Sequence, residues 1–109
     1  MAILTAKGFI SLVEQGKAVF LDINPPDLYH QGHAAGVYNV PFQAESWKDD
    51  VRRILKGQSL PIGLYADSHA VMETAVRVLD EESFDVIFTW DRGLKGWQEA
   101  QLPIDRQNG

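Results

Sequence analysis

The side chains best suited to chemistry lie in a short segment, "YADSHAVM", between an apolar run and an amphipathic one. Within it, Asp67, Ser68 and His69 are the three residue types of a hydrolase triad, in consecutive order. Neighbouring side chains diverge, however, and the members of a triad meet across a fold rather than along the chain. We therefore interpret Ser68 as the cap of a following helix and Asp67 as a charge that favours its positive end. His69 stays open as a lone acid or base.

Other candidate residues stand farther away in the sequence. Asp22 ends an apolar run and could be a catalytic carboxylate, but no acid or base partner is evident, so we favour hydrogen bonds to loop amides. His30 and His33 are spaced as half of a metal site. A glycine between them ends a helix, so we expect no metal. Trp90 and Trp47 could mark a hydrophobic binding surface.

Helical and strand patterns alternate along the chain. We expect strands at 18–23, 36–42, 61–65 and 84–89, and helices at 5–15, 24–32, 45–57, 68–79 and 93–101. Thr5 and Asn24 are expected as helix caps, with Pro25 at a first helical position and Gly32 at a helix end. The run "KDDVRR" predicts a solvated helix face with internal ion pairs.

Alternation of this kind is typical of a parallel sheet covered on both faces. In such sheets, ligands bind beyond the carboxyl ends of the strands. Asp22, Asp67 and Trp90 are therefore expected near that edge, and Trp97 is expected in the core.

Composition limits the function further. With 109 residues we expect one domain, 1–109, with a frayed tail at 105–109. The chain has no cysteine, which excludes disulfides, thiolate metal sites and a cysteine nucleophile. A net charge of −5 argues against nucleic acid and anionic membranes as partners. No apolar run is long enough to span a bilayer and no signal peptide is recognisable, so we expect a cytoplasmic protein, and we expect no cofactor.

Two motifs carry a family resemblance. The segment "VFLDINPPDLYHQGHAAGVYNVPF" resembles the first half of a rhodanese (sulfurtransferase) domain, and "TWDRGLKGWQEAQLPI" resembles its carboxyl-terminal signature. The matching residues are Asp22, Gly32, His33, Gly36, Asn39, Pro41, Gly93, Leu94, Lys95, Trp97, Leu102 and Pro103. The resemblance implies an α/β domain with a central, mainly parallel five-stranded sheet flanked by helices on both faces.

The resemblance does not extend to the chemistry. Active members of the family carry a cysteine at the position of Ala66, which takes sulfur as a persulfide, and basic residues in the loop around it. Here the loop holds Asp67, His69 and Val71 at positions where the family has arginine, glycine and a basic residue, and Asn24 replaces an upstream arginine. Several changes together indicate natural loss of activity. The candidate pocket comprises Asp22, Ala66, Asp67, Ser68, His69, Ala70, Val71 and Trp90.

Three hypotheses follow. The first is a catalytically inactive domain that serves as a binding or regulatory module for an unknown protein or small-molecule partner. The second is an enzyme of the same superfamily with a non-cysteine pocket chemistry, built on His69 with Asp22 or Asp67. The third, a sulfurtransferase subunit whose chemistry comes from another chain, is disfavoured because the loop lacks an anion site.

Overall fold

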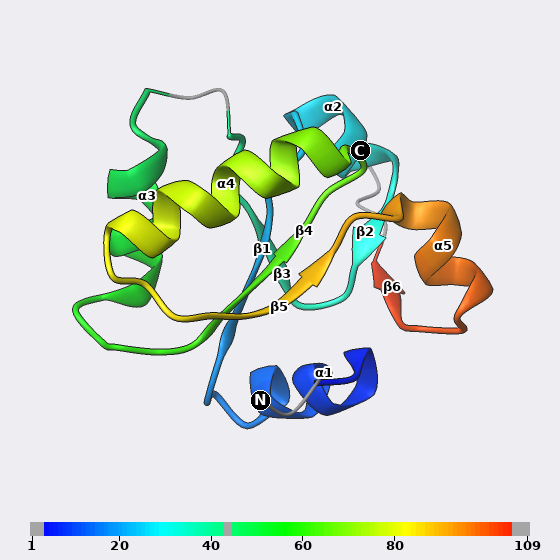
Figure 1. Cartoon of the computed structure of the whole chain (residues 1–109). Helices are drawn as coiled ribbons and strands as arrows, with labels where there is room; N and C mark the ends of the chain where they lie inside the picture. Colours follow the sequence, from blue (N-terminus) through cyan, green and yellow to red (C-terminus); the bar gives the residue numbers. More distant parts are fainter. Residues whose placement is uncertain (1–3, 43–44, 106–109) are drawn as a thin grey trace.

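A parallel β-sheet forms the centre of the computed structural model, which describes residues 4–42 and 45–105 (Figure 1). Its strands lie in the order β3-β1-β4-β5, and each neighbouring pair is parallel. The strands are β1 (Val19–Asp22), β3 (Val37–Asn39), β4 (Ile62–Tyr65) and β5 (Val86–Trp90). Both β1 and β4 are buried along their whole length, which explains their continuous apolar character.

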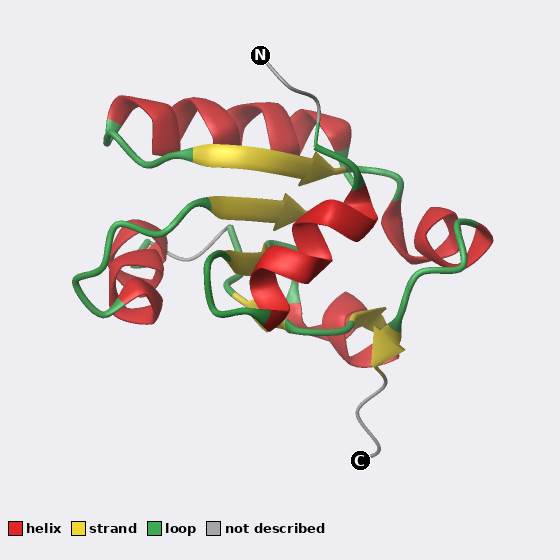
Figure 2. Cartoon of the chain, turned by 90° about the horizontal axis from the view of Figure 1, so that it is seen from below, coloured by secondary structure: helices red, strands yellow, loops and turns green. Residues whose placement is uncertain are grey.

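Helices cover the two faces of the sheet (Figures 1 and 2). They are α1 (Ala6–Glu14), α2 (Pro26–Gln31), α3 (Trp47–Leu55), α4 (His69–Glu81) and α5 (Gly93–Glu99). The apolar faces of α3 and α4 share one core with the sheet, and those of α1 and α5 share the other. Of the helices in the described ranges, none is long and apolar enough to cross a membrane.

The core beneath α1 is aromatic, and it depends on one glycine. Phe9 is fully buried, stacked on Phe88 at a centroid distance of 4.8 Å and edge-on to Phe20 at 5.1 Å. A β-carbon at Gly63 of β4 would lie only 2.3 Å from Cζ of Phe9. Gly63 is therefore required by packing, because it allows α1 to rest directly on the middle of the sheet.

The predicted α/β class with a parallel sheet is confirmed, but the strand count differs. The resemblance implied five strands in the central sheet, whereas the described residues form four. A separate antiparallel pair joins β2 (His33–Ala34) to β6 (Ile104–Asp105). Asp105, expected in a frayed tail, pairs with His33 in this ribbon, and residues 106–109 of that tail lie outside the described residues.

Two of the predicted helix caps are confirmed and one is wrong. The side chains of Thr5 and Ser68 each accept a hydrogen bond from the amide three residues later, at 3.0 and 3.2 Å. The residue before α2 is Pro25, not Asn24. The Asn24 amide group instead reaches across the fold to Asp67, and this longer-range pairing replaces a local cap.

The tryptophans of α3 and α5 are both interior residues. Trp97 is fully buried as predicted, and its Nε1 donates to the carbonyl of Pro103 at 2.7 Å. The suggestion of a binding surface at Trp47 is wrong, since this side chain is 3% exposed and donates to the carbonyl of Val40 at 2.9 Å. Its indole lies on the apolar stripe that α3 turns toward the sheet.

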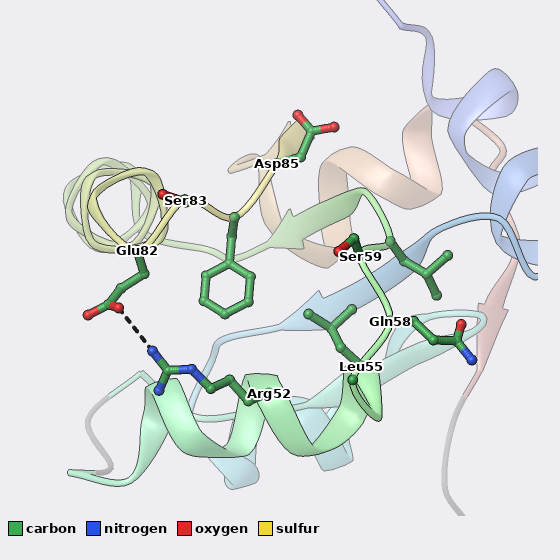
Figure 3. Close-up of a pocket in the computed structure, with 10 residues that line it drawn as sticks. Arg52, Leu55, Gln58, Ser59, Glu82, Ser83 and Asp85 are labelled. Carbon is green, nitrogen blue, oxygen red and sulfur yellow. Dashed lines mark hydrogen bonds and ion pairs between the residues drawn. The ribbon is translucent and has the colours of Figure 1, made fainter.

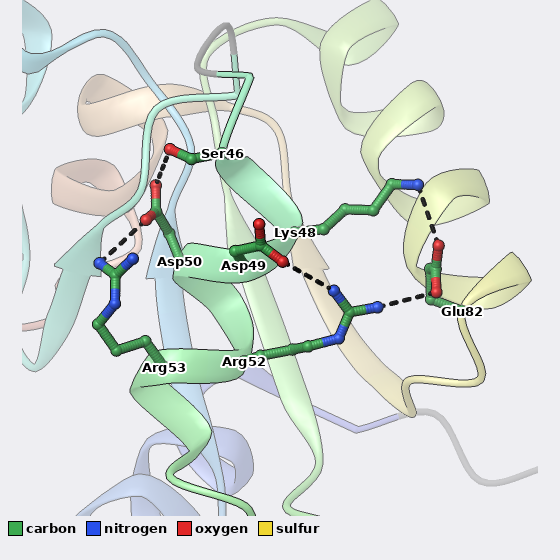
Figure 4. A network of polar contacts seen from close by, with 7 residues as sticks. All are labelled: Ser46, Lys48, Asp49, Asp50, Arg52, Arg53 and Glu82. Atoms are coloured by element: carbon green, nitrogen blue, oxygen red, sulfur yellow. Dashed lines mark hydrogen bonds and ion pairs between the residues drawn. The ribbon is translucent and has the colours of Figure 1, made fainter.

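The charged run on α3 behaves as predicted. Its exposed side chains pair with one another along the helix (Figure 4). The internal pairs are Arg52–Asp49 at 3.2 Å and Arg53–Asp50 at 3.0 Å. Exposed pairs of this kind contribute only a few tenths of a kcal/mol each, about 0.3–0.5.

Candidate functional site

The carboxyl ends of three strands bring the predicted site residues together. Asp22, Tyr65 and Trp90 are consecutive partners in the register of β1, β4 and β5. Residues 66–68 connect β4 to α4, and residues 69–71 form the first turn of α4. We call the whole segment loop 66–71, because it corresponds to the loop singled out in the sequence. The loop residues from Asp67 onward are exposed or partly exposed. The predicted placement of Asp22, Asp67 and Trp90 at one edge of the sheet is therefore confirmed.

Ala66 closes the base of the loop. It is fully buried, its methyl group belongs to the core between the sheet and α3 and α4, and its amide donates to the carbonyl of Trp90 at 2.8 Å. This residue offers no nucleophile, because a methyl group has neither a lone pair nor an acidic proton.

Hydrogen bonds from within the loop and from Asn24 hold the loop backbone. Ser68 uses its hydroxyl to accept from the amide of Val71 at 3.2 Å and its carbonyl to accept from that of Met72 at 3.0 Å. The amide of Asp67 donates to the Asn24 side-chain oxygen at 3.0 Å. The amides of Asp67 and Val71, which could otherwise receive an anion, are thus already paired within the protein.

Asn24 connects the loop to β1 through a chain of hydrogen bonds. Its Nδ2 donates to Oδ1 of Asp67 at 3.2 Å, across 43 residues of sequence. Its own amide donates to Oδ1 of Asp22 at 2.9 Å. Asn39 adds a second support, since its Nδ2 donates to the carbonyls of Asp22 and Asn24 at 3.1 and 3.0 Å. Together these contacts fix the loop relative to two strands.

Asp22 is a buried acid with one unsatisfied oxygen. Its side chain is fully buried, and Oδ2 has no hydrogen-bond partner among the described residues. Burial raises the pKa of Asp22 to about 7; the Asn24 amide opposes this shift and the nearby charge of Asp67 adds to it. The expectation that Asp22 accepts from a loop amide is confirmed.

Tyr65 is the partner of Asp22 in the β1–β4 register, and it too has a buried oxygen without a hydrogen-bond partner among the described residues. Burial raises the pKa of the Tyr65 phenol, and the charges of Asp22 and Asp67 raise it further. The hydroxyl therefore stays protonated and does not act as a base at this edge of the sheet.

His69 is exposed and lies between two carboxylates. Its Nδ1 contacts Oδ2 of Asp91, and its Nε2 lies 2.6 Å from Oε1 of Glu73. The hydrogen bond to Asp91, followed by that to Glu73, raises the pKa of His69. Both ring nitrogens can donate only when the ring is protonated, so the arrangement favours an imidazolium ion rather than a free base.

The side chains of Asp67, Ser68 and His69 do not form a catalytic triad. Ser68 caps α4, Asp67 pairs with Asn24, and His69 faces other carboxylates. Glu73 could have been foreseen as a partner of His69, because residues four apart meet on a helix. Asp91 lies 22 residues away, and no local pattern indicated it.

Trp90 forms a wall of the site toward α5. Its Nε1 donates to the carbonyl of Gly93 at 3.1 Å, and its ring stands edge-on to Trp97 at 4.9 Å. The start of α5 also approaches the loop closely: a β-carbon on Gly93 would lie 2.8 Å from Oδ1 of Asp67. Gly93 has a φ of +68°, a second reason for glycine here.

A shallow hollow adjoins the loop along α4. It has a volume of about 430 Å³ and is lined by His69, Met72, Glu73, Val76, Arg77, Thr89 and Asp91. Of the eight residues predicted to form a pocket, only His69 lines it. Asp22 and Trp90 lie at the ends of β1 and β5, and the other five residues belong to the segment 66–71.

The histidines of α2 and β2 do not converge on a metal. His33 is buried, its Nδ1 lies 2.7 Å from the carbonyl of Tyr29, and its ring stacks on Tyr29 at 3.7 Å. Within residues 4–42 and 45–105, no three His, Cys, Asp or Glu side chains form a set that could hold a metal ion.

Comparison with known proteins agrees with this geometry. The model of the rhodanese-like domain family matches residues 5–100. The chain belongs to the rhodanese-like domain family. Its fold is shared with a thiosulfate sulfurtransferase from Pseudomonas aeruginosa, with a TM-score of 0.79 and 20% identity over 98% of this chain and 20% of that one. A rhodanese-like domain from Anabaena sp. gives a TM-score of 0.68 at 23% identity, over 98% of this chain and 81% of that one.

Curated relatives match most of this chain. An uncharacterized protein of Buchnera aphidicola is 26% identical over 94 residues, covering 86% of this chain and 63% of that protein. The uncharacterized protein YibN of Escherichia coli is 25% identical over 95 residues, covering 87% of this chain and 66% of YibN. This rhodanese-like chain therefore spans slightly less than two thirds of the length of these relatives.

Proposed function

We propose that this rhodanese-like domain does not transfer sulfur and instead binds a protein or small-molecule partner through loop 66–71. One observation carries the proposal. The loop keeps its connection to α4 and its support from β1, but Ala66 stands at its base and Asp67 is bonded into its rim. The scaffold of a site is retained without a group that could hold a persulfide.

Electrostatics at the loop also oppose an anionic sulfur donor. At ~4 Å, two like charges repel by about 1 kcal/mol in water and about 4 kcal/mol at an effective dielectric constant near 20. Asp67 is exposed, so the lower value applies to its charge alone. Asp91 and Glu73 lie close by and add to the negative field around His69. A partner with neutral or basic groups is better matched to this edge than thiosulfate.

Sulfur transfer from thiosulfate to cyanide tests the first half of the proposal. We expect wild type and Ala66→Cys to stay at the uncatalysed background. Ala70→Cys is a matched control, since it places a thiol in the same loop at an exposed position. A wild-type rate well above background contradicts the proposal, and a fast Ala66→Cys enzyme contradicts our account of the loop electrostatics.

Partner capture tests the second half. A partner protein that is captured by the wild-type domain should no longer be captured by Asp67→Lys, which reverses the charge at this position of the loop. It should still be retained by Asp80→Lys, which makes the same change on the exposed side of α4. Equal retention by both variants places the binding surface elsewhere.

A second candidate function is an enzyme that uses His69. The contact between Asp91 and Nδ1 favours it, because a carboxylate orients the catalytic histidine of many hydrolases. Against it, Glu73 occupies the other nitrogen and Ser68 is engaged as a helix cap. Any activity found should disappear in His69→Ala; retention of that activity clears His69 of the role.

A further inference from the structure

Two buried oxygen atoms lie without partners at the sheet edge that borders loop 66–71. They are Oδ2 of Asp22 and the hydroxyl oxygen of Tyr65, and neither has a hydrogen-bond partner among the described residues. The two residues are at most 1% exposed. They are opposite each other in the β1–β4 register, so their side chains leave the sheet on the same face. A buried polar group without a partner is unfavourable, and far more so when it carries a charge.

Hydrogen bonds link the buried Asp22 to the exposed loop through a single residue, Asn24. Oδ1 of Asp22 accepts from the Asn24 backbone amide at 2.9 Å. The Asn24 side chain accepts from the Asp67 amide at 3.0 Å and donates to Oδ1 of Asp67 at 3.2 Å. Asn24 is buried, whereas Asp67 lies at the surface. The residue that holds the loop down is therefore itself bonded to the buried acid.

No positive charge balances the ionised form of Asp22. Within the described ranges, no basic side chain forms an ion pair or a hydrogen bond with it, and the charge that acts on it is the like charge of Asp67. From β4, Tyr65 faces it with a phenol whose pKa is raised by burial and by both aspartates. From β3, the uncharged Asn39 donates to its backbone carbonyl. Ionisation of Asp22 therefore places an unpaired charge in the interior.

The carboxylate at the opposite end of the sheet has a different environment. There a cavity of about 400 Å³ is lined by residues that precede β4 and β5 (Figure 3). Glu82, which lines this cavity, pairs with Lys48 at 3.0 Å and with Arg52 at 2.9 Å. These contacts, that of Lys48 first, lower the pKa of Glu82. A carboxylate paired in this way keeps its charge through neutral pH, so we expect the pH response at the end that contains Asp22.

We propose that Asp22 is a proton-sensing residue that controls loop 66–71. The loop is closed, with both Asn24–Asp67 hydrogen bonds formed, while Asp22 is protonated. When Asp22 loses its proton, the loop opens, water reaches Oδ2, and the Asn24–Asp67 bonds are exchanged for bonds to water. A conformation that hydrates the charge gains population as the proton leaves. Because this loop is the proposed binding surface, the inference rests on that proposal and adds its regulation by pH.

The direction and the pH window follow from the proton balance. In the open loop, the hydrated carboxyl of Asp22 titrates near its ordinary value of 3.8, whereas burial in the closed loop raises its pKa to about 7. The open population therefore rises with pH between these two values and stays constant above the higher one. Because linkage allows up to about tenfold for each pH unit in this window, we expect an increase of at least about tenfold from pH 5 to pH 8.

Amide hydrogen exchange at Asp67 measures the opening without any partner. Protection factors, which remove the intrinsic pH dependence of exchange, should fall at this amide by at least about tenfold from pH 5 to pH 8 in wild type. In Asp22→Asn they should not change with pH. Asp27→Asn, the same change at an exposed position of α2, should behave as wild type. Constant protection in wild type, or a fall that persists in Asp22→Asn, overturns the proposal.

Two further measurements assign the response to Asp22. His69, the titratable neighbour in the loop, contacts Asp91 and Glu73, and His69→Gln should keep the fall in protection. Loss of the fall in this variant would assign the response to the histidine instead. In wild type, the carboxyl-carbon shift of Asp22 in NMR gives its own midpoint, which should coincide with the pH at which protection stops falling. A different midpoint refutes the proposal without any variant.

The amide of Leu64, in the central strand β4, reports opening of the whole sheet. Its protection should exceed that of Asp67 at every pH. Equal protection at the two amides overturns the proposal, because the protein would then unfold as a whole. Partner capture is measured separately. A pH response without a captured partner refutes the proposed function alone, whereas a captured partner without a pH response refutes this inference alone.

Discussion

Replacing Asp22 with asparagine is expected to stabilise the protein above neutral pH and to change its stability little near pH 4. The pKa of this carboxyl rises from 3.8 to about 7 in the folded protein, mainly because it is buried. Each pKa unit corresponds to about 1.4 kcal/mol, so the shift corresponds to about 4 kcal/mol.

The sign follows from where the proton is held. Between about pH 4 and pH 7, folded Asp22 keeps a proton that the unfolded chain has released. The free energy of unfolding therefore falls as pH rises through this window. Above pH 7, the full destabilisation caused by the buried, ionised Asp22 carboxylate is present. Asparagine cannot ionise, so Asp22→Asn escapes the cost, and its oxygen can still accept from the amide of Asn24.

Urea denaturation of both proteins across pH 4 to pH 8 measures the effect. The advantage of Asp22→Asn should grow from near zero to about 4 kcal/mol. Asp80→Asn, at an exposed position of α4, removes the same charge without relieving a buried carboxyl. A difference between Asp22→Asn and wild type that does not change with pH would refute the reasoning, as would a variant that is less stable at pH 8.

The remaining predictions concern the loop and the core. Asn24→Ala removes both hydrogen bonds to Asp67 and should cost about 1–3 kcal/mol, with faster hydrogen exchange at the Asp67 amide. The titration midpoint of His69 in NMR should lie above its usual 6.5 and fall toward it in Asp91→Asn, so the stabilising ion pair is present at low pH and is lost as pH rises through that midpoint. Gly63→Ala places a β-carbon against an aromatic ring of α1 and should cost about 1–3 kcal/mol in thermal unfolding.

Each of these has a clear contrary outcome. An Asp67 amide that exchanges at the same rate in Asn24→Ala shows that the side-chain bond does not hold the loop. If the titration midpoint of His69 does not change in Asp91→Asn, then Glu73 and not Asp91 raises the pKa of His69. An unchanged melting temperature for Gly63→Ala shows that the ring of Phe9 moves aside freely.

Local sequence signals predicted the local structure well. The hydroxyl caps at Thr5 and Ser68 depend only on residues within the same turn, and both are present. The apolar runs at 18–23 and 61–65 each contain an observed strand, because strands buried on both faces cannot alternate with polar residues. The ion pairs within α3 follow from spacing on a helix.

Contacts between distant residues account for what could not be predicted. Asn24 is a residue type that often caps helices, but its side-chain amide donates to Asp67, 43 residues away. This contact depends on the pairing of β1 with β4, which brings the two segments together. Asp91 reaches His69 for the same kind of reason, through the neighbouring ends of β4 and β5. The raised pKa of Asp22 depends on burial by surrounding elements, which a single position in the sequence does not reveal.

The hydrogen bonds between Asn24 and the loop also couple the two residues energetically. Asp67 is held by Asn24 at its amide and its carboxylate, and that carboxylate fills the space beside Gly93. A basic residue in place of Asp67 removes the carboxylate that accepts from Asn24, whereas the hydrogen bond from the position-67 amide to Asn24 can remain. The effects of changes at Asn24 and at Asp67 on the free energy of unfolding are therefore expected to be non-additive, because each residue supplies the partner of the other.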